Sequence, residues 1–393
     1  MSPGRSKTVY CASIGPELIA HDIDVDGAAL LRRSAATLPV NIQYVWPHPS
    51  QRTLYAVSSN GGPGGVVGDT HRANALTIDP STGALRHHGA AAVLPSRPIH
   101  TSVDRHGQYL FTAYNSPSHI TVHRLNADGS IGAEVAQPDK LDTGIYAHQV
   151  LAAPDNKTVL LVTRGNDAKP GQPEDPGAIK TYRFADGVLR NLASIAPGSG
   201  LGFGPRHLDF HPERPWVYVS IERQNKLYVY ARDDNTGLAG EPMFVKDTLA
   251  NPQPRVRQAA GAIHVHPNGK FVYVTNRASD LLDGADGSKA FTGGENNVAV
   301  FAIDQATGEP TLFQNADAHA IELRTFGIEP SGRMLVAASI RPLPFRDASG
   351  IRTVPARQSV YAIGDDGRLT FKRQYDVETG RVQQFWSGMV TLA

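Results

Sequence analysis

The sequence contains one cysteine, Cys11, among its 393 residues. A single thiol excludes an internal disulfide and any zinc or iron–sulfur site built from several thiolates. Cys11 lies in the apolar run 8–12, which favours a buried, inert thiol over a nucleophile. No stretch approaches the roughly 18 apolar residues of a membrane span, and the basic residues within 1–7 precede no apolar segment. We therefore expect neither a signal peptide nor a membrane partner, and we predict a cytoplasmic protein.

An excess of charge of one sign is also missing, because 38 basic residues face 37 acidic residues. This balance excludes a general polyanion binder, so we expect no nucleic-acid partner. Charged residues make up only 19% of the chain, whereas the sequence has 38 glycines and 28 prolines. Such a composition is typical of many turns and few long solvent-facing helices. With 40% hydrophobic residues, the chain can bury a sizeable core and is not expected to be disordered.

One sequence element recurs six times as a short strand, a turn and a second apolar strand. Clear examples are 205–219 and 260–274, in which the turns read His211-Pro212 and His266-Pro267-Asn268-Gly269. The matching turn positions are 49, 105, 154, 212, 267 and 330. A second element, with two strands joined at a glycine, alternates with the first and occurs seven times. Its glycines are Gly27, Gly83, Gly129, Gly187, Gly237, Gly308 and Gly367.

Two hairpins per period give four antiparallel strands per unit, and seven units of this size fill the chain. This pattern predicts an all-β fold, a seven-bladed β-propeller that forms a single domain over residues 1–393. The chain opens with second-strand material at 7–13 and closes with a lone first-strand candidate at 382–386. We therefore predict that the C-terminal strand completes a blade with three N-terminal strands and closes the ring.

Two repeated positions carry polar side chains where a purely structural repeat would carry small or apolar ones. Six residues before each turn stand Gln43, Ile99, His148, Arg206, Gly261 and Arg324. Ten residues after each turn stand Ser59, Asn115, Arg164, Glu222, Arg277 and Ile340. Both positions belong to the same face of a blade, so we predict a polar cluster at one mouth of the central channel. Several arginines around Glu222 favour a bound carboxylate or phosphate, and the alternative is a buried network that bridges blades.

Four long insertions follow second strands, at 60–74, 165–177, 278–296 and 342–357. They are rich in glycine, proline and aspartate, and we predict that they are loops overhanging the same mouth. The alternative interpretation is that they are tolerated surface insertions.

Other chemical motifs are weak. The chain has no Gly-x-Ser-x-Gly nucleophile elbow, and the glycines within 198–204 lack the spacing of a dinucleotide-binding loop. His264 and His266 resemble a metal-binding pair, but His266 belongs to the turn repeat together with His48 and His211. A structural role is therefore favoured, and we expect neither a metal ion nor an organic cofactor.

The segments 204–212 and 272–277 resemble the seven-bladed β-propeller lactonase family. This family includes the propeller type of 6-phosphogluconolactonase and the fungal 3-carboxy-cis,cis-muconate lactonizing enzyme. Further matches are 98–100, 147–156 and 323–326, so the resemblance runs nearly from end to end. It implies that His148, Arg206, Glu222 and Arg277 form the catalytic set. The sequence departs from the family pattern at Ile221, where asparagine is usual, and in its longer loops.

We expect a metal-independent lactonase that hydrolyses a sugar-acid or carboxylated lactone to the hydroxy acid. Glu222 or His148 is the candidate general base, and Arg206 or Arg277 would stabilise the oxyanion while the other holds the substrate anion. The candidate substrate-binding residues are His100, Arg324, Gln43 and Arg164. The alternatives are a cycloisomerase of the muconate-lactonizing type and a non-catalytic interaction propeller. The expected partner is a small anionic lactone or carboxylate, and a monomer is favoured.

Overall fold

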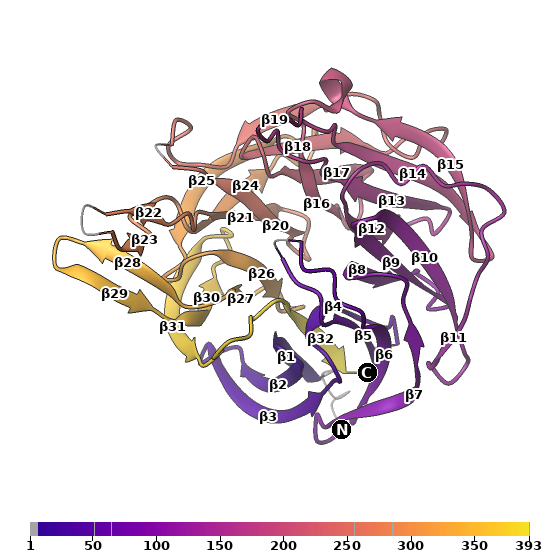
Figure 1. Ribbon diagram of the computed structural model, residues 1–393, viewed down its shortest axis with the longest axis horizontal. Coiled ribbons are helices and arrows are strands. Elements are labelled where there is room, and N and C mark those ends of the chain that lie inside the picture. The colour runs from indigo at the N-terminus through magenta and orange to yellow at the C-terminus, as the bar shows by residue number, and fades with distance from the viewer. Residues whose placement is uncertain (1–6, 51, 64, 255, 285–286, 393) are drawn as a thin grey trace.

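The computed structural model describes residues 7–50, 52–63, 65–254, 256–284 and 287–392. The basic segment 1–6, which the signal-peptide argument used, lies outside the described residues. Seven four-stranded antiparallel sheets surround a central axis, as Figure 1 shows. This arrangement confirms the predicted seven-bladed propeller. In the described part of the chain, no helix is long and apolar enough to cross a membrane.

In six blades the strands run outward from the axis in chain order, and in the seventh the C-terminal strand β32 lies inside the first three strands of the chain. The innermost strands are β4 (Ile42–Pro47), β8 (Pro98–Val103), β12 (Ala147–Ala152), β16 (Pro205–Phe210), β20 (Ala259–Val265), β26 (Leu323–Ile328) and β32 (Ser387–Leu392). The second strands are β5 (Thr53–Ser59), β9 (Tyr109–Asn115), β13 (Thr158–Thr163), β17 (Trp216–Ile221), β21 (Phe271–Arg277), β27 (Met334–Ser339) and β1 (Lys7–Ile14).

The outer half of each blade is a hairpin. The third strands are β6 (His71–Ile78), β10 (Ser118–Leu125), β14 (Ala178–Ala185), β18 (Lys226–Ala231), β24 (Asn297–Ile303), β30 (Ala356–Ile363) and β2 (Glu17–Asp24). The fourth strands are β7 (Leu85–Val93), β11 (Ile131–Glu134), β15 (Val188–Ile195), β19 (Phe244–Asp247), β25 (Pro310–Asp317), β31 (Leu369–Val377) and β3 (Ala29–Thr37). All seven predicted hairpin glycines lie between the third and fourth strands. One short 3-10 turn, η1 (Pro197–Gly200), precedes β16.

The ring closes as predicted, but with a different strand. β32 pairs antiparallel with β1 from Ser387 opposite Ala12 to Leu392 opposite Lys7. The predicted closing strand at 382–386 is therefore wrong by about one strand length. Phe385 and Trp386, in the predicted segment, are buried by packing and belong to no strand. Because buried strands are also rich in apolar residues, the segment looked like a strand in the sequence.

The core lies between adjacent blades rather than inside any one of them. One cluster joins Cys11 and Leu18 of the closing blade to Leu54 and Leu76 of the next blade. Burial of such apolar surface is the main stabilising contribution to the fold. Cys11 is fully buried, and burial raises the pKa of its thiol to about 12, as expected for an inert thiol.

Two repeated hydrogen bonds also join neighbouring blades. The turn histidines His48, His211 and His266 each bond through Nε2 to a glycine carbonyl in the next blade, at 2.9 Å in every case. Second-strand tyrosines donate to the carbonyl oxygens of the hairpin glycines of the next blade: Tyr55 to Gly129, Tyr218 to Gly308 and Tyr273 to Gly367. His266 therefore has the structural role that the repeat predicted.

Candidate active site

A β-bulge marks the first strand of six blades. The register between first and second strands shifts at the position that the repeat singled out: Gln43, Ile99, His148, Arg206, Gly261 and Arg324. A bulge breaks the alternation of a strand and redirects the side chain of the extra residue. This explains why polar side chains of different blades can point into the channel mouth instead of into the apolar layers between blades.

The second repeated position lies at the same open end of these hairpins, where each second strand ends. Asn115 and Arg277 are the last residues of β9 and β21, and Arg164 and Glu222 directly follow β13 and β17. These four side chains line one cavity together with His148 and Arg324 from the bulges. The structure thus brings residues of both repeated positions together at one mouth of the channel.

The cavity has a volume of about 550 Å³, which is within the usual range of small-molecule sites. Two of the four insertions form part of its wall. The first contributes Gly62, Pro63, Gly65, Val66 and Val67, and the second contributes Asn166, Asp167 and Lys169. The third insertion contributes Ala278, Ser279 and Asp280 to an adjoining hollow beside Glu222 and Arg277.

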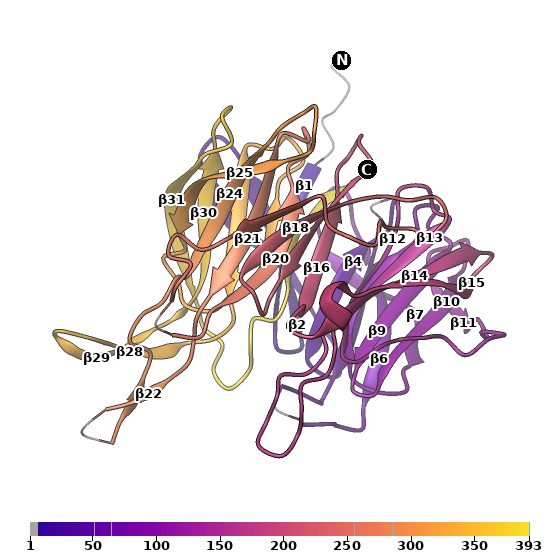
Figure 2. The same cartoon turned by 90° about the horizontal axis from the view of Figure 1, so that it is seen from above.

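The third and fourth insertions are not the plain loops that were predicted. They contain the hairpins β22 (Leu282–Asp283) with β23 (Lys289–Ala290) and β28 (Leu343–Asp347) with β29 (Gly350–Val354). Phe291 and Phe345 pair in a bridge that joins the two insertions. Figure 2 shows β22, β28 and β29 projecting from one face, opposite to the face where both chain ends are marked. No residue of the hairpin β28–β29 is among those that line the cavity, although the hairpin projects from the same face of the ring.

Glu222 is the centre of a cluster of arginines. Its carboxylate oxygens lie 3.3 Å from Arg164 Nε, 3.2 Å from Arg206 Nε and 3.4 Å from Arg277 Nη2. Burial alone would raise the pKa of Glu222, but the charges of Arg277, Arg164 and Arg206 outweigh it and hold this pKa at about 2. The carboxylate is therefore ionised at neutral pH. Three guanidinium groups around one carboxylate leave an excess of positive charge.

Three histidines lie beside this cluster, near the axis. The ring centroids of His148 and His207 are 5.0 Å apart, and those of His100 and His207 are 6.1 Å apart. Burial and the charge of Arg206 lower the pKa of His148 and His207 well below the ordinary value, and that of His100 to about 3. All three imidazoles are neutral at pH 7. Within the described residues, His148 Nδ1 has no hydrogen-bond partner.

Of the other sequence-predicted residues, three lie behind the cavity wall and one lines it. Arg206 is only 1% exposed and His100 is fully buried, so neither lines the cavity. Gln43 is also buried, and its Oε1 accepts a 2.9 Å hydrogen bond from Arg97 Nε. Arg164 lines the cavity and bridges Glu222 to Asp167, which its Nη2 contacts at 2.8 Å.

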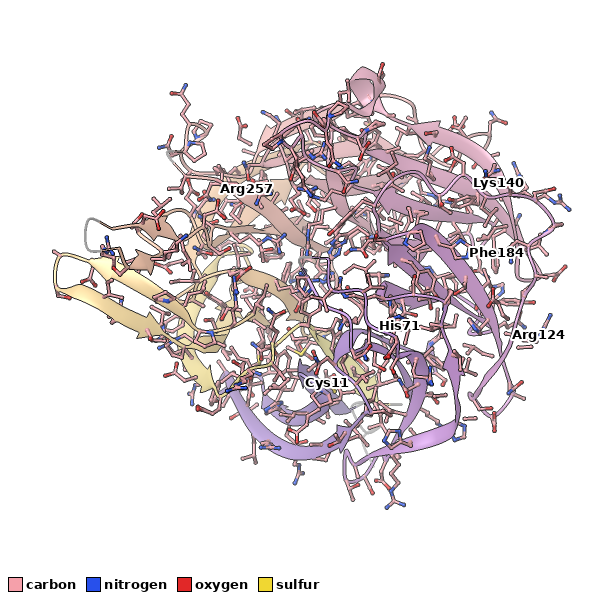
Figure 3. All side chains as sticks on the ribbon, in the orientation of Figure 1. Cys11, His71, Arg124, Lys140, Phe184 and Arg257 are labelled. Carbon is pink, nitrogen blue, oxygen red and sulfur yellow. The ribbon has the colours of Figure 1, made fainter. Side chains whose placement is uncertain are left out.

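Sequence reasoning missed several residues of the cavity wall, namely Arg97, Tyr146, Phe385, Asp167 and Arg257. Arg97 and Tyr146 could have been found, because both stand eight residues before a repeated turn, two residues before the bulge positions Ile99 and His148. Phe385 lies in the closing segment, which has no repeated turn to reveal it. Figure 3 shows Lys140 and Arg124 at the outer rim of the ring, away from the cavity that Arg257 lines.

The cavity therefore combines a neutral imidazole, an ionised carboxylate and several guanidinium groups. Such a site can bind an anion, stabilise a developing oxyanion and accept a proton from water. In the described part of the chain, no three His, Cys, Asp or Glu side chains are grouped so that they could hold a metal ion.

Comparison with known proteins agrees with this description. Residues 8–341 match the model of a family described as "Lactonase, 7-bladed beta-propeller". The chain is 30% identical over 313 residues to the 6-phosphogluconolactonase of Pectobacterium carotovorum, covering 76% of this chain and 86% of that one. It is 28% identical over 332 residues to the Bacillus subtilis 6-phosphogluconolactonase, covering 82% and 84%. The solved structure of a periplasmic gluconolactonase from Pseudomonas aeruginosa aligns with a TM-score of 0.73 at 21% identity, covering 99% of this chain and all of that one.

Proposed function

The chain belongs to the seven-bladed β-propeller lactonase family, and from this premise we propose that it hydrolyses the ring ester of a sugar-acid lactone. The relatives described above carry the name 6-phosphogluconolactonase, which makes 6-phosphogluconolactone the first substrate to test. The observation that supports hydrolysis most directly is the joint presence of His148 and Arg277 in the cavity wall. The named relatives do not favour the cycloisomerase or the non-catalytic alternative.

We propose that His148 is the general base. A base must offer a lone pair that no donor already occupies, and Nδ1 of the neutral His148 has no hydrogen-bond partner among the described residues. Burial and the charges of nearby arginines lower the pKa of His148. The oxygens of Glu222, by contrast, already lie within 3.4 Å of three guanidinium groups, and its pKa is about 2. A bound substrate anion and the developing oxyanion would both favour the protonated form of His148.

The reaction then follows from these positions. Water attacks the lactone carbonyl and gives its proton to His148, while Arg277 stabilises the negative charge on the carbonyl oxygen. The bond between the carbonyl carbon and the ring oxygen breaks, and the imidazolium returns the proton to the ring oxygen. The product is the open hydroxy acid, and the free enzyme is restored. Glu222 acts as a positioning residue, because its carboxylate attracts and holds Arg277, Arg164 and the buried Arg206.

The test is the release of acid from 6-phosphoglucono-1,5-lactone and glucono-1,5-lactone at constant pH, relative to spontaneous hydrolysis in buffer. We expect a large acceleration of at least one of them. Rates equal to those in buffer for both lactones would reject the proposal.

We also propose that the protein acts in the cytoplasm and as a monomer; one chain lines the whole cavity, so no second subunit is needed to complete it. Cell fractionation and sedimentation velocity test these two points. Recovery in a periplasmic fraction, or a dimer at micromolar concentration, would contradict them.

A further inference from the structure

Two arginines in the cavity wall, Arg97 and Arg324, have no carboxylate partner among the residues that the structure describes. Arg97 donates through Nε to Gln43, and Arg324 donates through Nε to the carbonyl oxygen of Phe385 at 3.1 Å. Both guanidinium groups also lie near the ring of Phe385, with Cζ at 5.7 Å and 3.6 Å from its centroid. These contacts orient the two groups and leave their terminal nitrogens for a ligand.

This pair differs from the arginines around Glu222, whose charges are partly compensated. Burial lowers the pKa of Arg324 to about 9, and the charges of Arg277 and Arg97 add to this effect. Two like charges that lie close together in a partly buried site, without a counterion, raise the free energy of the folded protein. An arrangement of this kind is stable in the presence of an anion that pairs with both.

We propose that Arg97 and Arg324, supported by Phe385, form a second subsite that binds an oxyanion group of the substrate away from its lactone carbonyl. The inference rests on the proposed hydrolysis, in which Arg277 faces the carbonyl. The oxyanion can be a phosphate monoester or a carboxylate. Two unpaired guanidinium groups match the two charges and several acceptor oxygens of a phosphate better than the single charge of a carboxylate.

The experiment compares three lactones: neutral glucono-1,5-lactone, a carboxylate-bearing glucarolactone and 6-phosphoglucono-1,5-lactone. For Arg97→Gln and Arg324→Gln, the ratio of kcat/KM for the phosphorylated lactone to that for the neutral one should fall at least tenfold, through KM. Arg368→Gln is the matched control, because Arg368 also stacks on a phenylalanine, Phe313, but in an outer hairpin. Its ratio should equal that of the wild type.

The three substrates separate the two sources of the anion. A loss confined to the glucarolactone would assign the subsite to a carboxylate and still support it. Equal losses on all three lactones, or no loss on either charged lactone, would overturn the proposal.

A binding measurement separates failure of the subsite from failure of the proposed function. Calorimetric titration with the open acids 6-phosphogluconate and gluconate requires no turnover. We expect the wild type to bind 6-phosphogluconate more tightly than gluconate. In each glutamine variant, the Kd for 6-phosphogluconate should rise at least tenfold. If hydrolysis is absent but this pattern holds, only the hydrolase proposal fails. Equal affinity of the wild type for both acids would overturn a phosphate subsite even in an active enzyme.

Discussion

His148 is a base candidate because of its neighbours, and a substitution can test this directly. His148→Gln should lower kcat by about 10²–10⁴-fold, because glutamine keeps hydrogen bonding but cannot take a proton. His123→Gln is the control, since His123 is also buried with a lowered pKa but lies on β10, away from the cavity wall. Steady-state kinetics on the same lactone measure both. A greater loss in Glu222→Gln than in His148→Gln would instead assign the proton transfer to Glu222.

Two arginines that look equivalent in the sequence should respond differently to alanine. Arg206→Ala leaves a cavity and removes one of the cations around Glu222, so we expect a loss of roughly 3–5 kcal/mol in the free energy of unfolding. Arg277 is partly exposed to the cavity, so Arg277→Ala should keep most of the stability and lower kcat by about 10²–10³-fold. Thermal melts and kinetics of both variants check this. A well-folded, inactive Arg206→Ala would place Arg206 in the reaction itself.

Acid should destabilise the protein before it protonates Glu222. His100, His148 and His207 have folded-state pKa values below that of an unfolded histidine, so the unfolded chain binds the protons first. Their stabilising effect is fully present above pH 6.5 and is lost as the pH falls, by about 1.4 kcal/mol per pH unit for each histidine. Glu222 adds a loss between pH 4.5 and about 2. Denaturant unfolding at pH 7.5, 6 and 5 measures the slope, and a flat profile would contradict it.

The residues that the sequence could predict are those whose position repeats. His148 and Arg324 stand out because a bulge occurs at the same place in six blades, and the turn spacing records it. Gln43 and Arg206 occupy the same position, yet spacing does not reveal that both lie behind the wall. Exposure depends on the neighbouring blades, which no local pattern describes.

Among the elements, three of the turns after first strands contain a glycine that closely approaches a histidine of the preceding blade, namely Gly107, Gly269 and Gly332. Gly332 has φ +75°, and a Cβ there would lie 2.3 Å from the ring of His266. Gly332→Ala should therefore lower the melting temperature more than Gly171→Ala, because Gly171 has φ +77° but no heavy atom within 4 Å of its Cβ position. The control carries only the backbone strain, about 1–2 kcal/mol. Equal melting temperatures would show that the ring of His266 moves aside freely.

The strands themselves were predictable where turn residues bound them, as the seven hairpin glycines show. The closing strand was misplaced because Phe385 and Trp386 are apolar for a reason other than membership of a strand. Phe385 supports two arginines, and Trp386 fills a gap between blades. The strands within the third and fourth insertions were missed, because short hairpins rich in polar residues have no regular alternation.

For the whole molecule, ring closure by β32 is the contact that joins the two ends of the chain. Deleting residues 387–393 should leave β1 with an open edge and expose the apolar surface that Val390 and Leu392 cover. We expect loss of cooperative melting and a tendency to aggregate, measured by calorimetry and light scattering. A truncated protein that melts cooperatively near the wild-type temperature would contradict the closure scheme.

The single domain over 1–393 remains a prediction at this scale. The cores between blades support it, because each blade shares apolar surface with two neighbours. Limited proteolysis that released a stable group of blades would contradict it.

The pairing of Lys7 with Leu392 also means that the start and the end of the described fold are neighbours, on the face opposite to the cavity. A short peptide could join them, and the chain could be reopened at a hairpin between a third and a fourth strand on that same face. Such a circular permutant would have a different blade as its closing blade while the arginines and histidines of the cavity stayed in place. The order in which the blades are synthesised is therefore separable from the chemistry of the site.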